Sequence, residues 1–316
     1  MTDRTVYILG AAMTAAGAAI MLATQPPVAG PLAVVAYVVL HAVVLRWGLL
    51  VYGGVGGLAA LALSAFAVPL LSGSAGLGPA AGWALTACAV VRCLLDPTIQ
   101  STLTIATGGL VAVAFGSPAI LPPLIAYSLF VALLRTATAE RWEPRRRVLQ
   151  ASLVATLIGW AVLAVVVWLV GRFSHLPEVD DFSGVARGVQ VAAAVLAGVN
   201  HTDHSGWHAA LLVPLLLAAL RPWRAQRRYS DASWLVALLC LLVPTLWSAT
   251  EGQRTAAAVA VPFLALLAAA CWDVSRPVWL RRMASLLLVL HVVGSITWVL
   301  AARQPAPALP AAVRPA

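Results

Sequence analysis

The chain has 316 residues, of which 62% are hydrophobic and only 10% are charged, and its mean hydropathy is +0.93. A soluble domain carries roughly 25% charged residues, so this composition excludes one. The net charge is +9 and every basic residue is arginine. The absence of lysine excludes Schiff-base chemistry and a Walker-type phosphate-binding lysine.

Continuous apolar runs of about the length of a bilayer crossing recur along the chain. Such runs predict transmembrane helices, because lipid offers backbone polar groups no partner outside their own helix. The fold class predicted is therefore an all-α, polytopic transmembrane helical bundle. We predict eleven spans, at residues 6–24, 30–45, 48–71, 79–95, 99–117, 119–135, 149–170, 207–220, 232–249, 255–272 and 283–301.

The pair 99–117 and 119–135 is separated only by "GSPAILPP", which is either a tight turn or a kink, so the count ranges from 10 to 12. No loop is long enough to form a soluble domain. Residues 1–301 are therefore predicted to form one membrane domain, with an outer interfacial segment at about 187–206. The remaining tail, 302–316, is rich in proline and alanine, and we expect it to be disordered.

The arginines predict an orientation. Three loops, 135–147, 221–228 and 276–282, are strongly basic, and basic loops stay in the cytoplasm. With the N-terminus inside, 15 of the 20 arginines face the cytoplasm. The arginines left outside are Arg172, Arg187, Arg254, Arg303 and Arg314. We therefore predict an N-in, C-out topology.

The stretch "GVNHTDHSGWH" at 198–208 is the most polar part of this apolar chain, and the topology puts it at the outer membrane face. His201, His204 and His208 have the i, i+3, i+7 spacing of one helix face, with Asp203 beside them. This stretch has three alternative interpretations: a metal site, a catalytic or substrate-binding site, and a polar turn at the membrane interface.

A second outer cluster is "TEGQR" at 250–254. Glu251 and Arg254 are three residues apart, so on a helix they could form an ordinary ion pair. Alternatively, Arg254 could bind a phosphate through its guanidinium fork, because ionisable groups at membrane depth are costly and usually face a cavity or one another. Glu251 would then act as a general base or orient the arginine.

Other polar residues favour structural interpretations. The outer loop 171–187 is predicted to be solvated. Arg92 and Asp96 are predicted to form a salt bridge at a helix end. The cysteines, which lie in apolar runs without paired spacing, read as small buried hydrophobes; they are Cys88, Cys93, Cys240 and Cys271. The glycines of "GGVGG" at 53–57 would let helices pack closely.

Two further histidines, away from the polar stretch 198–208, lie within predicted spans. His41 falls near the inner end of 30–45 and His291 falls in the middle of 283–301. Because a haem needs two histidines at similar depth, we do not expect them to bind one.

The outline of residues 200–301 resembles a known family. A polar outer segment is followed by a proline-containing span, a basic inner loop, the outer turn "EGQR", a helix with "VPFLALLAA" and a last helix. This resembles the C-terminal part of bacterial multi-pass glycosyltransferases of the GT-C class. The resemblance implies a polyprenyl-phosphate-linked sugar donor, with Glu251 and Arg254 at an outward-facing site.

The chain departs from that family at the first outer loop, where a catalytic acid is usual. Here the loop is "TQPPVAG" at 24–30, without a carboxylate, and "SGSAGLG" at 72–78 has none either. A catalytic acid would have to come from elsewhere on the outer side. The candidates are Glu178, Asp180, Asp181, Asp203 and Glu251.

The hypothesis is thus an envelope protein of the bacterial cytoplasmic membrane, with a glycosyltransferase-like site. The candidate catalytic residues are Glu251, Asp203 and His204, and the candidate substrate-binding residues are Arg254, His201 and His208. No cofactor or metal is assigned, although a divalent cation could bind. The partners expected are membrane lipids and the lipid-linked sugar, without nucleic acid; the oligomeric state stays open. The alternative is a transporter, flippase or non-catalytic membrane subunit.

Overall fold

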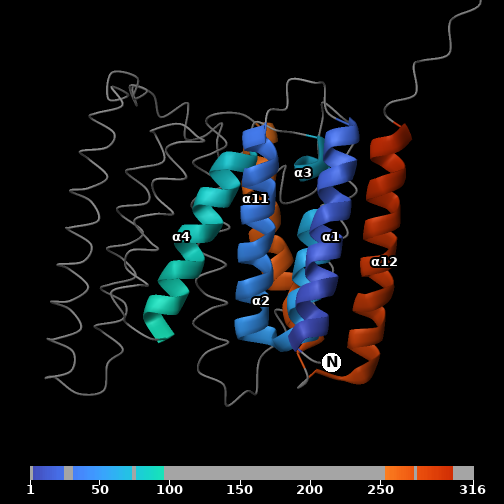
Figure 1. The fold of residues 1–316 in the computed structure, drawn as a ribbon. Helices are drawn as coiled ribbons and strands as arrows, with labels where there is room; N and C mark the ends of the chain where they lie inside the picture. The colour runs from blue at the N-terminus through green and yellow to red at the C-terminus, as the bar shows by residue number, and fades with distance from the viewer. Residues whose placement is uncertain (1–2, 25–30, 73–75, 96–252, 274–275, 302–316) are drawn as a thin grey trace, which may run out of the picture.

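The computed structural model of the protein describes residues 3–24, 31–72, 76–95, 253–273 and 276–301, and all regular structure in these ranges is helical. The elements are α1 (Asp3–Thr24), α2 (Pro31–Ala65), α3 (Val68–Ser72), α4 (Leu77–Leu95), α11 (Gln253–Ala268), the 3₁₀ turn η3 (Ala269–Trp272) and α12 (Val278–Ala301). Figure 1 shows the long helices running side by side along one direction. The predicted all-α class is confirmed for this part of the chain.

Four of these helices are long and apolar enough to cross a membrane, as judged from length and composition. They are Asp3–Ala23, Pro31–Ala65, Thr255–Trp272 and Val278–Ala301. The described part thus has the helices of an integral membrane protein. The predicted spans from 99–117 to 232–249, the interfacial segment 187–206 and the tail 302–316 lie outside the described residues.

The predicted boundary between spans 30–45 and 48–71 is wrong, because the helix continues through Arg46 and Trp47 to Tyr52. The break falls at Gly53, which has φ 76° and ψ −170°. This backbone conformation is open almost only to glycine. We call residues 31–52 the first arm of α2 and residues 54–65 its second arm.

The two arms run antiparallel. A Cβ atom built on Gly48 would lie 2.7 Å from the Cα of Gly57, although the two glycines are nine residues apart in the sequence. A straight helix would separate them by about 13 Å. Gly57 allows the close packing that the glycines of "GGVGG" predict. The turn at Gly53 was not predicted, because the sequence places Gly53 inside one continuous span, 48–71.

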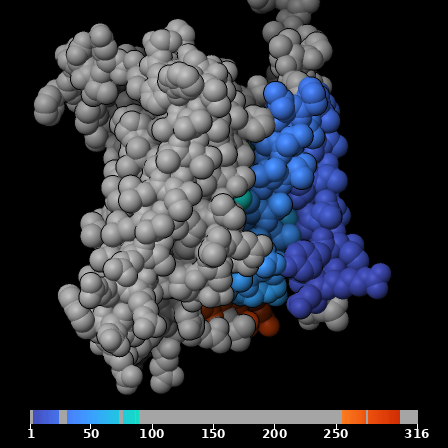
Figure 2. Space-filling model, turned by 60° about the vertical axis from the view of Figure 1, so that its left-hand side comes forward, coloured from blue at the N-terminus to red at the C-terminus, as the bar shows by residue number. Residues whose placement is uncertain are grey.

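The span formed by α11 and η3 is the centre of the bundle. Of its 18 residues, Thr255–Trp272, 94% are buried. In the apolar 18-residue stretches of α1 and α12, the buried shares are 28% and 22%. Figure 1 accordingly shows α12 at the edge of the bundle, and in Figure 2 the atoms of α1 and α2 form one continuous surface along the molecule. Large apolar side chains are exposed on these outer helices, as expected for surfaces that meet lipid tails.

The two ends of the bundle differ in charge. Val6 of α1 contacts Gly54, and Arg46 donates a hydrogen bond to the hydroxyl of Tyr7 at 3.4 Å, so the start of α1 lies beside the Gly53 turn. The end of η3 and the start of α12 lie there too, at the lower end of Figure 1. We call this the basic end. It carries Asp3, Arg4, Arg46, Arg92, Asp273, Arg276, Arg281 and Arg282, all the charged residues of the described ranges except Arg254.

The opposite end holds the start of α11. Gly76, just before α4, lies against Thr255 and Ala258 of α11. Arg254 therefore begins the central span at the end of the bundle that is otherwise uncharged in the described ranges.

Candidate functional site

A break in the helical backbone at Phe66 and Ala67 creates a polar site inside the bundle. The N–H of Ala67 bonds to the carbonyl of Ser64 at 3.1 Å, so the carbonyl of Leu63 loses its usual i+4 donor. The carbonyl of Ala65 loses its donor as well, because the residue four positions later is Pro69, which has no N–H. Two buried carbonyl oxygens thus need partners from outside the helix.

Side chains of two other helical segments supply those partners. The hydroxyl of Tyr37, from the first arm of α2, donates a hydrogen bond to the carbonyl of Ala65 at 2.5 Å. The Nε2 atom of His291, from α12, lies 3.1 Å from the carbonyl oxygen of Leu63. Because a carbonyl oxygen can only accept, Nε2 of His291 must carry the proton.

His41 and Ser64 complete the cluster. Nδ1 of His41 lies 2.7 Å from the carbonyl of Tyr37, and Nε2 lies 3.2 Å from the hydroxyl oxygen of Ser64. The same reasoning puts the proton of His41 on Nδ1, so Nε2 accepts the hydroxyl proton of Ser64. We call Tyr37, His41, Ser64 and His291 the polar cluster; all four side chains are buried.

The cluster corrects the predicted depth of His41. Since the first arm extends to Tyr52, His41 lies in the middle of its helix and not near the end. Like His291, it reaches the region of residues 63–64, so the two histidines do lie at similar depth. Both ring nitrogens of His41 are engaged by protein atoms, which indicates a structural role in the cluster.

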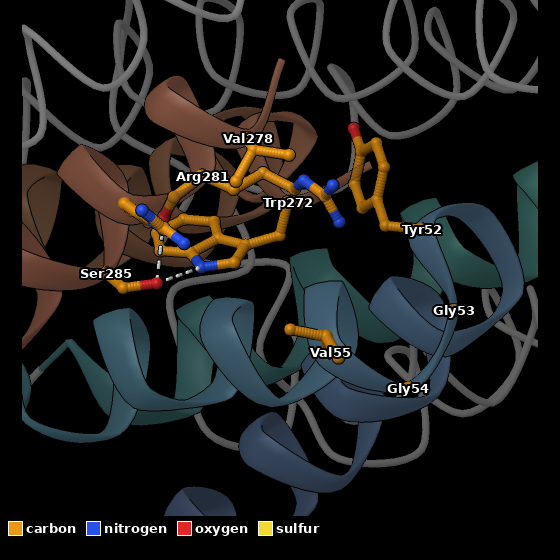
Figure 3. Close-up of a pocket in the computed structure, with 9 residues that line it drawn as sticks. Tyr52, Gly53, Gly54, Val55, Trp272, Val278, Arg281 and Ser285 are labelled. Carbon is orange, nitrogen blue, oxygen red and sulfur yellow. Dashed lines mark hydrogen bonds between the residues drawn. The ribbon is translucent and has the colours of Figure 1, made fainter. Parts of the chain in front are cut away.

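A cavity of about 530 Å³ opens at the basic end. It is lined by Tyr52, Gly53, Gly54, Val55, Trp272, Val278, Arg281, Arg282 and Ser285. Arg281 from α12 and Tyr52 from the end of the first arm face it from opposite sides (Figure 3). The indole N–H of Trp272 donates to the hydroxyl of Ser285 at 3.1 Å, and that hydroxyl donates to the carbonyl of Arg281 at 2.8 Å.

The cavity is electropositive. Nε of Arg281 is buried and has no hydrogen-bond partner in the structure. No carboxylate is among the described residues that line the cavity. The sequence predicted 276–282 as a loop, which is wrong from Val278 onwards because α12 begins there. Both arginines are therefore held on a helix, beside its positively polarised N-terminus.

Of the site residues predicted from the sequence, the structure describes only Arg254, and of it only the backbone, in the first turn of α11. The others, Glu251, Asp203, His204, His201 and His208, lie outside the described residues. Whether the two outer clusters converge thus stays a prediction. Within the described ranges, no group of three or more His, Cys, Asp or Glu side chains could hold a metal ion.

No protein-family model, curated protein or solved structure matches this chain.

Tyr37, Ser64 and the lining of the cavity were not among the site residues predicted from the sequence. A usable signal was present for Tyr37. Pro69 follows Ala65 by four residues, which marks a carbonyl without a donor inside an apolar run, and such a carbonyl calls for a hydroxyl or imidazole nearby. No comparable local signal pointed to the cavity, because its lining comes from three separate elements.

Proposed function

We propose that the protein is a multi-pass enzyme of the bacterial cytoplasmic membrane, which transfers a sugar from a polyprenyl-phosphate donor at the outer face. The orientation is inferred from charge. The basic end carries six of the seven arginines in the described ranges, and arginine-rich ends stay in the cytoplasm. The start of α11 then lies at the outer face.

The observation that carries the proposal is the position of Arg254. It occupies the first turn of the most buried span of the described part, so it belongs to a helix that packs mainly against protein. The N-terminus of that helix adds a partial positive charge, and an arginine fork binds phosphate oxygens in pairs. Arg254 would hold the donor phosphate, with help from His201 and His208.

Glu251 precedes the helix by two residues and is the first candidate for the base that activates the acceptor hydroxyl, with Asp203 and His204 as the others. This assignment follows the resemblance of residues 200–301 to GT-C glycosyltransferases. No cofactor is needed in this scheme, and a divalent cation could assist at the phosphate.

The test is sugar transfer by membranes that contain the full chain, with a radiolabelled polyprenyl-phosphate sugar as the donor. We expect Arg254→Ala and Glu251→Gln each to lower the rate at least 100-fold, as loss of a phosphate clamp or a general base does. Arg303→Ala, which removes an arginine predicted on the same side of the membrane, should leave the rate unchanged. Transfer that is equal in all four proteins, or absent from the parent with every donor, would contradict the proposal.

The alternative of a transporter or flippase needs polar groups along a path through the bilayer. In the described helices the polar cluster and Ser295 are such buried groups. The broken helix explains the bonds of Tyr37 and His291, which bind its freed carbonyls. Movement of a labelled donor across proteoliposomes without product would favour that alternative.

A further inference from the structure

We propose that the cavity at the basic end binds the headgroup of an anionic phospholipid from the adjacent leaflet. This inference concerns the end opposite to the proposed catalytic site, and it does not depend on sugar transfer.

The positive charge of the cavity favours an anionic ligand. Arg281 and Arg282 are neighbours in the sequence, both line the cavity, and no carboxylate is among the described residues that line it. Arg281 keeps a buried Nε–H without an acceptor. A buried, unpaired guanidinium N–H is costly. A phosphate oxygen in the cavity would accept that hydrogen bond and offset both charges.

Hydrogen bonds hold one wall of the cavity in a fixed position. The bond from Trp272 to Ser285, which in turn bonds to the carbonyl of Arg281, ties the end of η3 to the second turn of α12 (Figure 3). The wall of the cavity is thereby held in place before a ligand arrives. Its volume, about 530 Å³, falls within the usual range of small-molecule sites and suits a phosphoglycerol headgroup.

Exposed apolar side chains next to the cavity favour a lipid over a free phosphate. A stripe of exposed apolar side chains begins beside the two arginines and runs along α12 at alternating spacings of three and four residues. Its members are Trp279, Met283, Leu286, Leu290 and Val293, each more than half exposed. A phospholipid with its headgroup in the cavity would lay its acyl chains along this stripe, whereas inorganic phosphate would make no use of it. Basic pockets between transmembrane helices are a known form of headgroup site.

The experiment measures lipid binding to the purified full chain by native mass spectrometry, and thermal stability in nanodiscs. The probes are phosphatidylglycerol, phosphatidylcholine and inorganic phosphate. We expect phosphatidylglycerol to bind and to raise the unfolding temperature, and the other two to have little effect. Arg282→Gln should weaken phosphatidylglycerol binding about fivefold, and Arg281→Gln with Arg282→Gln about 30-fold.

Two matched variants keep the result interpretable if the double variant folds poorly. Arg282→Lys retains the charge and should retain most of the affinity. Arg46→Gln removes an exposed arginine that is at the same end but not in the cavity lining, and should bind like the parent. Equal binding of both lipids, equal loss in Arg46→Gln and Arg282→Gln, or full competition by inorganic phosphate would each overturn the proposal.

Discussion

The hydroxyl of Tyr37 donates a 2.5 Å hydrogen bond to the carbonyl oxygen of Ala65, 28 residues further along the chain. This bond links the two arms of α2 at the end opposite to the Gly53 turn. The oxygen is available because Pro69, four residues later, has no N–H to offer it. Gly17 of α1 makes room for the contact, since a Cβ atom there would collide with the tyrosine hydroxyl. Because Pro69 has no N–H, the carbonyl of Ala65 takes its hydrogen-bond donor, the Tyr37 hydroxyl, from the neighbouring helical arm.

Replacing Tyr37 by phenylalanine should leave the Ala65 carbonyl buried without a donor. We expect a loss of about 1–2 kcal/mol in the free energy of unfolding, the scale of an interhelical hydrogen bond in a membrane protein. Pro69→Ala supplies an N–H at the position where the backbone lacks one. The double variant should therefore lose less than the sum of the two single losses, measured by unfolding in mild detergent. Strictly additive losses would show that the two residues do not share this oxygen.

Replacing His291 by alanine should destabilise the bundle by about 1–3 kcal/mol, because the carbonyl of Leu63 loses its donor and a cavity is left. His291→Gln keeps an N–H donor and should restore part of the loss. Thr297→Val is the control on the same helix, since the hydroxyl of Thr297 bonds only to the carbonyl of Val293 in its own turn and is exposed. The unfolding temperatures of the three variants are measured in detergent and compared. A control as damaging as His291→Ala would refute the capping role.

Gly53→Ala should cost about 1–3 kcal/mol although nothing stands within 4 Å of the new methyl group. The cost is conformational, because a φ of 76° with a ψ of −170° is strained for any residue with a Cβ atom. At Gly54 the backbone is helical and a methyl group meets only the side chain of Val6, at 3.1 Å. We therefore expect Gly54→Ala to cost less. The comparison is made from the unfolding midpoints, and the reverse order would mean that the turn does not lie at Gly53.

The orientation can be tested with single cysteines in a chain that lacks Cys88, Cys93, Cys240 and Cys271. Val55, 57% exposed at the Gly53 turn, is the reporter for the basic end. In intact cells, an impermeant maleimide should label a cysteine at position 204 and leave those at 55 and 225 unlabelled until the membrane is opened. Labelling of position 55 in intact cells would invert the topology, and the outward-facing sugar-transfer site would fall with it.

Several helix positions were predictable from the sequence alone. The predicted spans 6–24, 79–95 and 255–272 correspond closely to α1, α4 and the pair α11 and η3. The reason is physical: the bilayer sets the length of an apolar run, and backbone hydrogen bonding in lipid makes that run a helix. The errors concern where helices begin and turn.

Charged residues misled the prediction at two helix ends. Arg46 falls between the predicted spans 30–45 and 48–71, yet it lies within the first arm of α2, and its long side chain reaches the hydroxyl of Tyr7 near the basic end. Arg281 and Arg282 were assigned to a loop and lie on α12. An arginine near a helix end can keep its charge in the polar interface while its backbone remains helical, so charge alone does not mark the boundary.

The sequence by itself determined that the chain is suited to lipid, that it is helical, and that its arginines are unevenly distributed, because composition and run length encode these properties locally. The tertiary structure alone decided which helices meet. It brings His291 to the carbonyl of Leu63 across 228 residues of sequence, and it gathers three elements around the cavity at the basic end. Such contacts depend on the packing of whole helices, and no local pattern of residues specifies that packing.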